Sequence, residues 1–295
     1  MLTIYTHSPS PFTKEFLKQA VKKIVGKYSG PDAVCDSLLR GLTKDGIAYN
    51  LNPNSPKNDT VIVLSGVAAL KSAIRQKERG AIKKLIAGPN IVSTPHDAEG
   101  IMRNPAIDTI LIPSKWVADF WEQEAPELKN KIRIWAAGVR VAAPGTRNGN
   151  PIVYDKMEDS ALLAHIVTTI IESGATPHIF TYASYNHANY MKALATAPYL
   201  IYLSKSESQG LALQEAWAHD VPTLVHKSTV WESGSHRFEA EQINAPYLTD
   251  QLGAIFSTNE ELKDLIVHTK TYHPKVYCDQ KHSDKVSAAT LLQIL

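Results

Sequence analysis

The sequence predicts an α/β protein built from two doubly wound parallel sheets, and three observations support this fold class. Short β-branched and aromatic runs alternate with stretches of helical periodicity along the 295 residues, as in repeated β and α units. Several of these runs are apolar at consecutive positions, which is typical of strands covered on both faces. The runs fall into two groups of five, and a chain of this length has room for two domains.

The first group of expected strands lies before residue 136. Its members are Leu2 to Tyr5, Val61 to Ser65, Ile91 to Ser93, Thr109 to Ile112 and Ile132 to Trp135. The densest cluster of turn-forming residues in the chain follows, from Val141 to Pro151, and we interpret it as the interdomain linker. We therefore expect an N-terminal Rossmann-like domain at residues 1–143 and a C-terminal one at 144–278, with a cleft opening at the linker.

The second group of expected strands follows the linker. Its members are Ile152 to Tyr154, His178 to Tyr182, Tyr199 to Leu203, Thr223 to His226 and Ala254 to Phe256. Asp159 or Ser160 can cap an amphipathic helix that Gly174 closes. Residues 279–295 are expected to form a terminal helix, whose docking partner the sequence does not identify.

The overall charge excludes a dedicated nucleic-acid binder, because the net charge is only +2. No apolar run is long enough to span a membrane, and the N-terminal residues lack the pattern of a signal peptide. We therefore expect a cytoplasmic protein. The two cysteines, Cys35 and Cys278, are expected to be reduced thiols.

The most informative segment runs from Ser204 to His226. The expected strand before it leads into a polar loop containing Gly210, and a helix is expected to begin near Gln209. In an open parallel sheet such a loop lies at the carboxyl end of a strand, where ligands bind. The helix N-terminus offers free N–H groups and the positive end of a dipole, which favours a phosphate or a cluster of sugar hydroxyls.

Two carboxylates, separated by seven residues, bracket the start of this helix. Glu207 lies in the loop, and Glu215 lies about two turns into the helix. This spacing lets one carboxylate reach a sugar and the other a ribose. The alternative is that Glu207 is a solvated loop residue and Glu215 an ordinary helix residue.

This segment resembles the retaining glycosyltransferases of the GT-B fold, specifically glycosyltransferase family 4. Glu207 and Glu215 match the E-x7-E motif of that family, Ser204 matches the serine before it, and Gly210 matches the second glycine of its E-G-F-G segment. Weaker similarities extend over most of the chain, at Tyr28 to Gly30, Thr94 to Asp97, Ile112 to Lys115, Ala137 to Val139 and Glu260 to Leu262.

The resemblance implies two Rossmann-like domains, with the acceptor on the N-terminal side and a nucleotide sugar on the C-terminal side. Glu215 would hold the ribose hydroxyls, and Glu207 would hold the hydroxyls of the donor sugar. His96, from the opposite domain, would contact the sugar near the reacting centre. A simpler role for His96 is to cap or fill a turn after its strand.

The resemblance also implies which groups bind the diphosphate. Backbone N–H groups at the helix start would do so, from Ser208, Gln209, Gly210 and Leu211. The family commonly carries two cations after the first strand of its second domain, whereas here Lys156 is the one obvious cation. Lys156 could equally be a solvated residue at a strand end. Gly30 would bring the backbone close to the ligand, although any turn could require a glycine there.

The function implied is transfer of a hexose, with retention, from a nucleotide-diphosphate sugar to a glycan or other hydroxyl acceptor. A GDP-sugar such as GDP-mannose is slightly favoured over a UDP-sugar, without a residue that proves it. No metal or other cofactor is expected, and the chain contains no D-x-D carboxylate pair.

Other interpretations remain open. The same fold could carry a nucleotide-sugar epimerase or a phosphorylase, or the chain could be a non-catalytic protein whose two domains close on a small ligand. The basic segment 14–27 is either an ordinary amphipathic surface helix or a weak contact with an anionic membrane surface.

Overall fold

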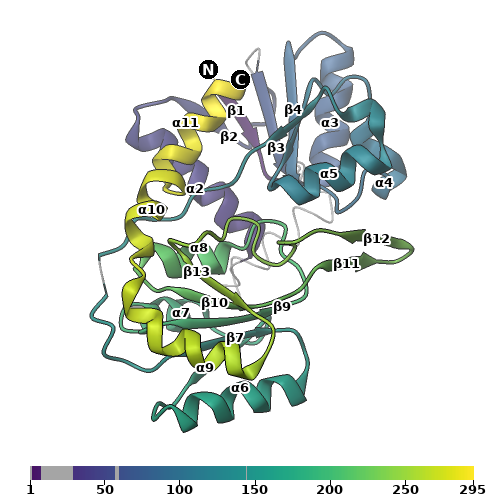
Figure 1. Cartoon of the computed structure of the whole chain (residues 1–295). Helices are drawn as coiled ribbons and strands as arrows, with labels where there is room; N and C mark the ends of the chain where they lie inside the picture. The colour runs from purple at the N-terminus through teal and green to yellow at the C-terminus, as the bar shows by residue number, and fades with distance from the viewer. Residues whose placement is uncertain (1, 8–28, 57–59, 144) are drawn as a thin grey trace. The chain divides into compact units, whose positions relative to one another are not determined.

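The computed structural model describes residues 2–7, 29–56, 60–143 and 145–295 (Figure 1). The basic segment 14–27 lies outside these residues. The chain divides into two compact units, one made of Met1–Gly138 together with Asp284–Leu295 and the other of Val139–Ser283. The chain therefore leaves the first unit a few residues before the linker expected at Val141 to Pro151. Among the described helices, none combines the length and apolar character needed to cross a membrane.

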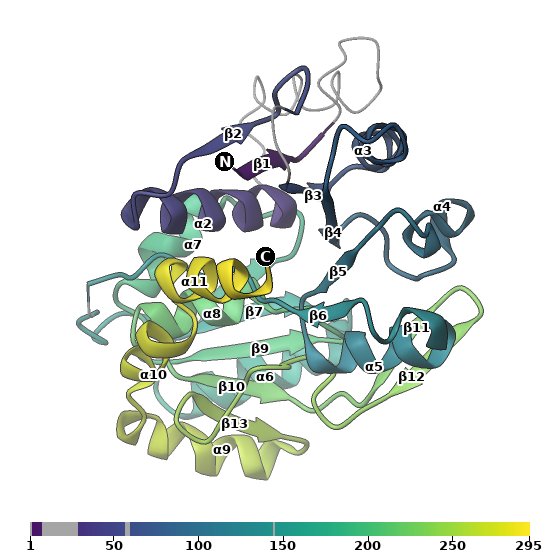
Figure 2. The same cartoon turned by 90° about the horizontal axis from the view of Figure 1, so that it is seen from above.

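The first unit contains a parallel sheet with the order β2-β1-β3-β4-β5-β6 among its described residues. Its strands are β1 (Leu2–Tyr5), β2 (Tyr49–Leu51), β3 (Thr60–Ser65), β4 (Lys84–Asn90), β5 (Thr109–Ile112) and β6 (Ile132–Ile134). Its helices are α2 (Gly30–Lys44), α3 (Val67–Glu78), α4 (Asp97–Gly100), α5 (Lys115–Glu124) and α11 (Asp284–Ile294), with short 3-10 turns η1 (Ile101–Arg103) and η2 (Pro126–Leu128). Figure 2 shows α2 and α11 on one side of this sheet and α3 and α5 on the other. This is the doubly wound arrangement predicted from the sequence.

One predicted strand of this unit is wrong. We expected Ile91 to Ser93, but the strand is β4 at Lys84–Asn90, which contains Gly88 and Pro89. In a sequence, a Gly-Pro pair indicates a turn, because proline has no N–H to donate to the hydrogen bonds between strands. The strand tolerates the pair because two residues of β4 face one residue of β3 there, a β-bulge. Gly88 has φ +110°, and a Cβ there would collide with the Leu111 carbonyl on β5.

The second unit contains a parallel sheet with the order β13-β10-β9-β7-β8 among its described residues. Its strands are β7 (Ile152–Lys156), β8 (His178–Thr181), β9 (Leu200–Ser204), β10 (Thr223–His226) and β13 (Gly253–Phe256). Its helices are α6 (Ser160–Glu172), α7 (His187–Leu194), α8 (Leu211–Ala218), α9 (Asn259–His268) and α10 (Pro274–Lys281), with a 3-10 turn η3 (Thr269–Thr271). All the strands predicted in this half are confirmed to within two residues.

Apolar side chains cover both faces of this second sheet. On one face, residues of α7, α8 and α10 pack against Tyr154 and Tyr202. On the other face, residues of α6 and α9 pack against Val153 and Ile201. Neighbouring residues of each strand point to opposite faces, so both must be apolar, which explains the consecutive apolar runs of the sequence.

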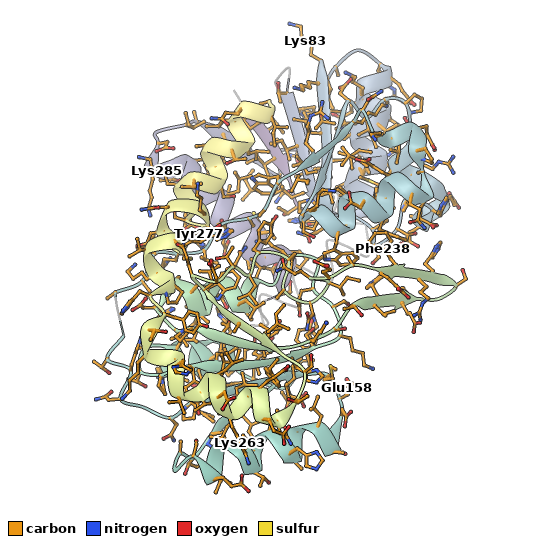
Figure 3. All side chains as sticks on the ribbon, in the orientation of Figure 1. Lys83, Glu158, Phe238, Lys263, Tyr277 and Lys285 are labelled. Atoms are coloured by element: carbon orange, nitrogen blue, oxygen red, sulfur yellow. The ribbon has the colours of Figure 1, made fainter. Side chains whose placement is uncertain are left out.

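An antiparallel hairpin, which the sequence analysis missed, follows β10. Its strands are β11 (Val230–Ser233) and β12 (His236–Glu239), and Figure 1 shows it extending beyond the strands of the second sheet. Trp231 pairs with Phe238 across the hairpin. Figure 3 labels Phe238 on this hairpin. Glu232 and Arg237 form the next pair along the strands. The aromatic pair and this charged pair therefore lie on opposite faces of the hairpin.

The single terminal helix expected at residues 279–295 is instead two helices that belong to different units. His282 interrupts the run: its φ is −126°, and its carbonyl accepts a hydrogen bond from the Val139 N–H at 2.8 Å. The second helix, α11, packs on α2 of the first unit. There Asp284, 1% exposed at its side chain, forms a bidentate pair with Arg40 at 2.7 and 2.9 Å.

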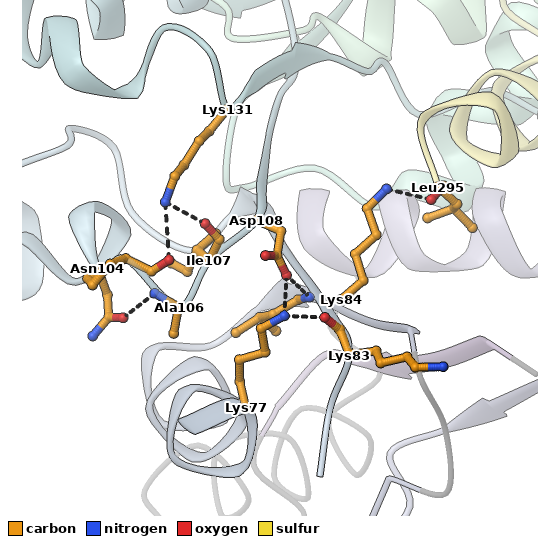
Figure 4. Close-up of polar contacts among 11 residues, drawn as sticks. Lys77, Lys83, Lys84, Asn104, Ala106, Ile107, Asp108, Lys131 and Leu295 are labelled. Carbon is orange, nitrogen blue, oxygen red and sulfur yellow. Dashed lines mark hydrogen bonds and ion pairs between the residues drawn. The ribbon is translucent and has the colours of Figure 1, made fainter. Parts of the chain in front are cut away.

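Further polar contacts hold α11 in place along its length. The Trp135 indole donates to the Ser287 carbonyl at 3.0 Å. Lys84 donates to the carbonyls of Ile294, at 3.1 Å, and Leu295 (Figure 4). Docking of the terminal helix thus depends on contacts between residues distant in sequence, and helical periodicity alone does not reveal them.

Both cysteines are buried free thiols, as the sequence analysis expected. Burial raises the pKa of Cys35, beside Asp36 and Asp32, to about 12, and burial raises that of Cys278 to about 12. A thiol with such a pKa is almost entirely protonated at neutral pH, which does not favour a role as a nucleophile.

The close approach of α2 and α11 predicts that Gly41→Ala destabilises the protein. A Cβ at position 41 would collide with the Asp284 carbonyl and the Ala288 methyl on α11. We expect a loss of about 1–3 kcal/mol in the free energy of unfolding, measured by urea denaturation. The matched control is Gly30→Ala in the same helix, where an added Cβ meets nothing within 4 Å. Stability of Gly41→Ala at or above that of the wild type would contradict this seating of α11.

Candidate functional site

The candidate site lies at the carboxyl ends of β7, β9 and β10 in the second unit. Strand β9 ends at Ser204, and the buried side chain of Asn244 donates to the carbonyls of Ser204, at 2.9 Å, and His226, at 2.7 Å. The Glu207 N–H donates to the Ile243 carbonyl at 2.9 Å. The segment at 243–244 therefore fixes this loop between two strand ends. No pattern in the sequence pointed to Asn244.

Gly210 ends the loop and begins the helix. It has φ +81° in the left-handed region, and an added Cβ would lie 3.2 Å from the Leu213 side chain. Helix α8 starts at Leu211, two residues after Gln209, near which we expected it to begin, and its N-cap residue, Gly210, has no side chain that could cap it. Gln209 is buried and donates from Nε2 to Gln214 Oε1 at 2.8 Å, whereas Ser208 is exposed.

Glu207 is held by three donors that converge on one carboxylate oxygen. Its Oε1 accepts hydrogen bonds from Lys156 Nζ at 2.8 Å, from the Tyr202 hydroxyl at 2.7 Å and from Ser204 Oγ at 3.0 Å. The Glu207 side chain is 11% exposed. A carboxylate this deeply placed requires such partners, because an unpaired buried charge costs several kcal/mol.

Lys156 ends β7, and the structure brings it together with Glu207, as the candidate site requires. Its ammonium group also lies 4.6 Å from the centre of the Tyr182 ring, a cation–π contact. Lys156 is therefore paired with a carboxylate, whereas the sequence left open a cation for the diphosphate or a solvated residue at a strand end. The pairing follows from strand order, since β7 and β9 are neighbours with Lys156 opposite Ser204.

Glu215 lies on α8 and pairs with His187, the first residue of α7. Its Oε1 lies 2.8 Å from His187 Nε2, and its side chain is 15% exposed. The hydrogen bond to Glu215 raises the pKa of His187 against the opposing effect of partial burial. Sequence reasoning missed His187, because a single histidine at a helix start carries no recognisable pattern.

Two of the predicted site residues, His96 and Gly30, belong to the first unit. His96 precedes α4, is 41% exposed at its side chain, and places Nε2 3.5 Å from a Glu124 carboxylate oxygen. The neighbouring Asp97 carboxylate accepts backbone N–H groups and shapes this turn. Gly30 is the exposed first residue of α2, directly after the N-cap Ser29.

The described residues contain no group of three or more His, Cys, Asp or Glu side chains arranged to hold a metal ion. The carboxylates at the candidate site instead pair with a lysine and a histidine. The site offers hydrogen-bond acceptors, the ammonium group of Lys156 and backbone N–H groups, which suit a polyhydroxylated, anionic ligand.

Comparison with solved structures finds similar proteins of known architecture. The apo lipopolysaccharide outer core galactosyltransferase WaaB matches with a TM-score of 0.56 at 10% identity, over 99% of this chain and 98% of its own. WaaG, a glycosyltransferase involved in lipopolysaccharide biosynthesis, matches with a TM-score of 0.50 at 12% identity, over 98% and 95%. TarM from S. aureus matches with a TM-score of 0.54 at 10% identity, over 88% of this chain and 58% of its own.

These structures share one architecture of two Rossmann-like domains. The chain has the GT-B fold. Within the GT-B fold, Glu207 and Glu215 lie in the second unit, and Gly30 and His96 lie in the first. No protein-family model and no curated protein matches the sequence, so the fold is established here by structure alone.

The His187–Glu215 pair predicts a pH-dependent contribution to stability. Since Glu215 raises the pKa of His187, the contribution is fully present below the unfolded value of 6.5 and is lost as pH rises through the raised pKa. His187→Gln should therefore lower the melting temperature more at about pH 6 than at about pH 9 in scanning calorimetry.

The control for this prediction removes the partner. In a Glu215→Gln background, His187→Gln should lose most of its pH dependence, because the neutral amide no longer favours the protonated histidine. An effect of His187→Gln that is equal at both pH values would contradict the pairing.

Proposed function

We propose that the protein is a glycosyltransferase that moves a hexose from a nucleotide-diphosphate sugar to a hydroxyl acceptor. The observation that carries this proposal is the juxtaposition of Glu207, Lys156 and the start of α8 at one edge of a GT-B sheet. Carboxyl ends of parallel strands are where such sheets bind ligands. The similar structures share only 10% and 12% sequence identity with this chain, so they support the fold alone. The proposed function therefore depends on the chemistry of this site.

The diphosphate is assigned to the loop and the start of α8. The backbone N–H groups from Ser208 to Leu211 and the dipole of α8 favour an anion at this point. Lys156 supplies a positive charge beside the same loop, 2.8 Å from Glu207. As the bond to the sugar breaks, negative charge grows on the leaving diphosphate, and preorganised donors of this kind stabilise it.

The two carboxylates are assigned to the two sugars of the donor. Glu215 accepts hydrogen bonds from the ribose hydroxyls, and Glu207 accepts them from the hydroxyls of the transferred hexose. Because Glu207 Oε1 already takes three hydrogen bonds, its charge is too strongly stabilised for a good nucleophile. This supports same-face displacement with retention, without a covalent enzyme intermediate. In the first unit, His96 is assigned to the hexose, and Gly30 is assigned to a backbone contact with the ligand.

The identity of the donor nucleotide is best approached by experiment. No described residue supports the slight preference for a GDP-sugar such as GDP-mannose. TarM was solved with UDP and α-GlcNAc-glycerol, so UDP-sugars are the first donors to test. WaaB is a lipopolysaccharide core galactosyltransferase, so glycans bearing free hydroxyls are the first acceptors to test.

The test of the proposed function is a screen of UDP- and GDP-hexoses with the wild-type protein, with and without acceptor. Sugar transfer to an acceptor is the expected result. Epimerised donor formed without acceptor would instead indicate an epimerase, and nucleotide binding without turnover of any donor would indicate a binding protein.

Glu207→Gln separates the sugar-holding role from nucleotide binding. Because a free nucleoside diphosphate has no hexose, its affinity should change by less than about tenfold. Turnover of the nucleotide sugar should fall by about 10²–10³-fold, since the lost contacts strengthen as charge develops in the transition state. Calorimetry and a rate assay on the same variant measure the two quantities.

The matched control is Glu172→Gln, which alters an exposed carboxylate paired with Lys263 at 3.0 Å on the same unit. It should leave both quantities unchanged. A parallel loss of affinity and rate in Glu207→Gln, or no loss in either, would remove Glu207 from its assigned role.

A further inference from the structure

The three donors to Glu207 differ in how freely they can leave it. Lys156 is a long, charged side chain at a strand end, 28% exposed, and under the proposed function it also serves the diphosphate. Tyr202 and Ser204 are neutral residues of β9, a strand paired on both sides, with β7 and with β10. When Lys156 turns toward a phosphate, these two hydroxyls remain to hold the carboxylate.

Of these two hydroxyls, that of Ser204 restrains Glu207 less strongly. Its single hydroxyl proton has two acceptors at 3.0 Å, the carbonyl of Ser206 and Glu207 Oε1. A hydroxyl proton can serve only one of them well at a time. The Ser204 hydroxyl therefore does not by itself fix the orientation of Glu207.

The hydroxyl of Tyr202 restrains Glu207 more strongly. Its hydroxyl donates to Glu207 Oε1 at 2.7 Å, a shorter contact than the 3.0 Å from the Ser204 hydroxyl. Tyr202 as a whole is 1% exposed, and its ring stacks on that of Tyr154, with 5.1 Å between the ring centres and an interplanar angle of 14°. A ring packed in this way cannot change rotamer without disturbing the core. Burial raises the pKa of Tyr202 well above its ordinary value, so it keeps its proton and donates.

We propose that Tyr202 is a positioning residue that keeps Glu207 aimed at the donor hexose while Lys156 engages the diphosphate. This inference rests on the proposed function, and it gives different roles to two of the donors to Glu207 Oε1. The buried hydroxyl of Tyr202 fixes the orientation of the carboxylate, and the ammonium group of Lys156 supplies positive charge to the phosphates. Without the Tyr202 hydroxyl, and with Lys156 turned toward the diphosphate, Glu207 would keep only the hydrogen bond from Ser204, whose proton is shared with the Ser206 carbonyl. The orientation of Glu207 would then no longer be fixed.

The test compares Tyr202→Phe with Tyr154→Phe. Both variants remove one hydroxyl from a buried ring of the same stack, but the Tyr154 hydroxyl meets the Tyr185 hydroxyl, at 3.3 Å, instead of Glu207. We expect Tyr202→Phe to lower kcat by about 10- to 100-fold, as for loss of a hydrogen bond to a charged group. Affinity for the free nucleoside diphosphate should stay within about threefold of the wild type. Tyr154→Phe should change neither quantity.

Two outcomes overturn the inference in a wild-type protein that transfers sugar. One is an unchanged kcat in Tyr202→Phe. The other is a parallel loss of kcat and diphosphate affinity, which indicates a merely structural role.

A second measurement keeps the inference testable if the wild type transfers no sugar and the proposed function fails. A double-mutant cycle on the free energy of unfolding combines Tyr202→Phe with Glu207→Ala. Direct holding of Glu207 predicts that the two effects are not additive, whereas additive effects overturn the inference whatever the activity.

Discussion

A single carboxylate oxygen, Glu207 Oε1, joins β7 and β9, two of the strands at whose carboxyl ends the candidate site lies. Lys156 at the end of β7, and Tyr202 and Ser204 at the end of β9, all donate to it. A charge that is 11% exposed must be satisfied in this way, or the loop that carries it would move outward into water. The path of the loop, and with it the start of α8, therefore depends on these three contacts.

The parallel sheet makes this convergence possible. Parallel strands end at the same edge, so residues far apart in sequence, such as Lys156 and Glu207, become neighbours there. The backbone around them is fixed by groups that touch no ligand in the proposed mechanism. Asn244 ties the ends of β9 and β10 together, and Gly210 supplies a left-handed turn that other residues rarely adopt.

Local pattern was sufficient to predict most of the strands, and the loop and helix that carry the two carboxylates, because consecutive apolar residues and a glycine turn are properties of short segments. It failed where distant contacts decide the outcome. A β-bulge against β3 admits Gly88 and Pro89 into β4, and the Val139 contact helps to end α10 at His282. The pairings of the two carboxylates with Lys156 and His187 depend on which elements become neighbours, and no spacing in one sequence reveals that.

The central claim is that the carboxyl edge of the second sheet binds a nucleoside diphosphate. The most direct measurement is calorimetric titration of UDP and GDP into the wild type and Glu215→Ala, with Glu172→Ala as the surface control. The account predicts that the wild type binds at least one of them and that Glu215→Ala loses about 1.5–3 kcal/mol, from a charge-assisted ribose hydrogen bond, while the control loses nothing. Equal affinity in Glu215→Ala and the wild type, or no binding of either nucleotide by the wild type, would contradict it.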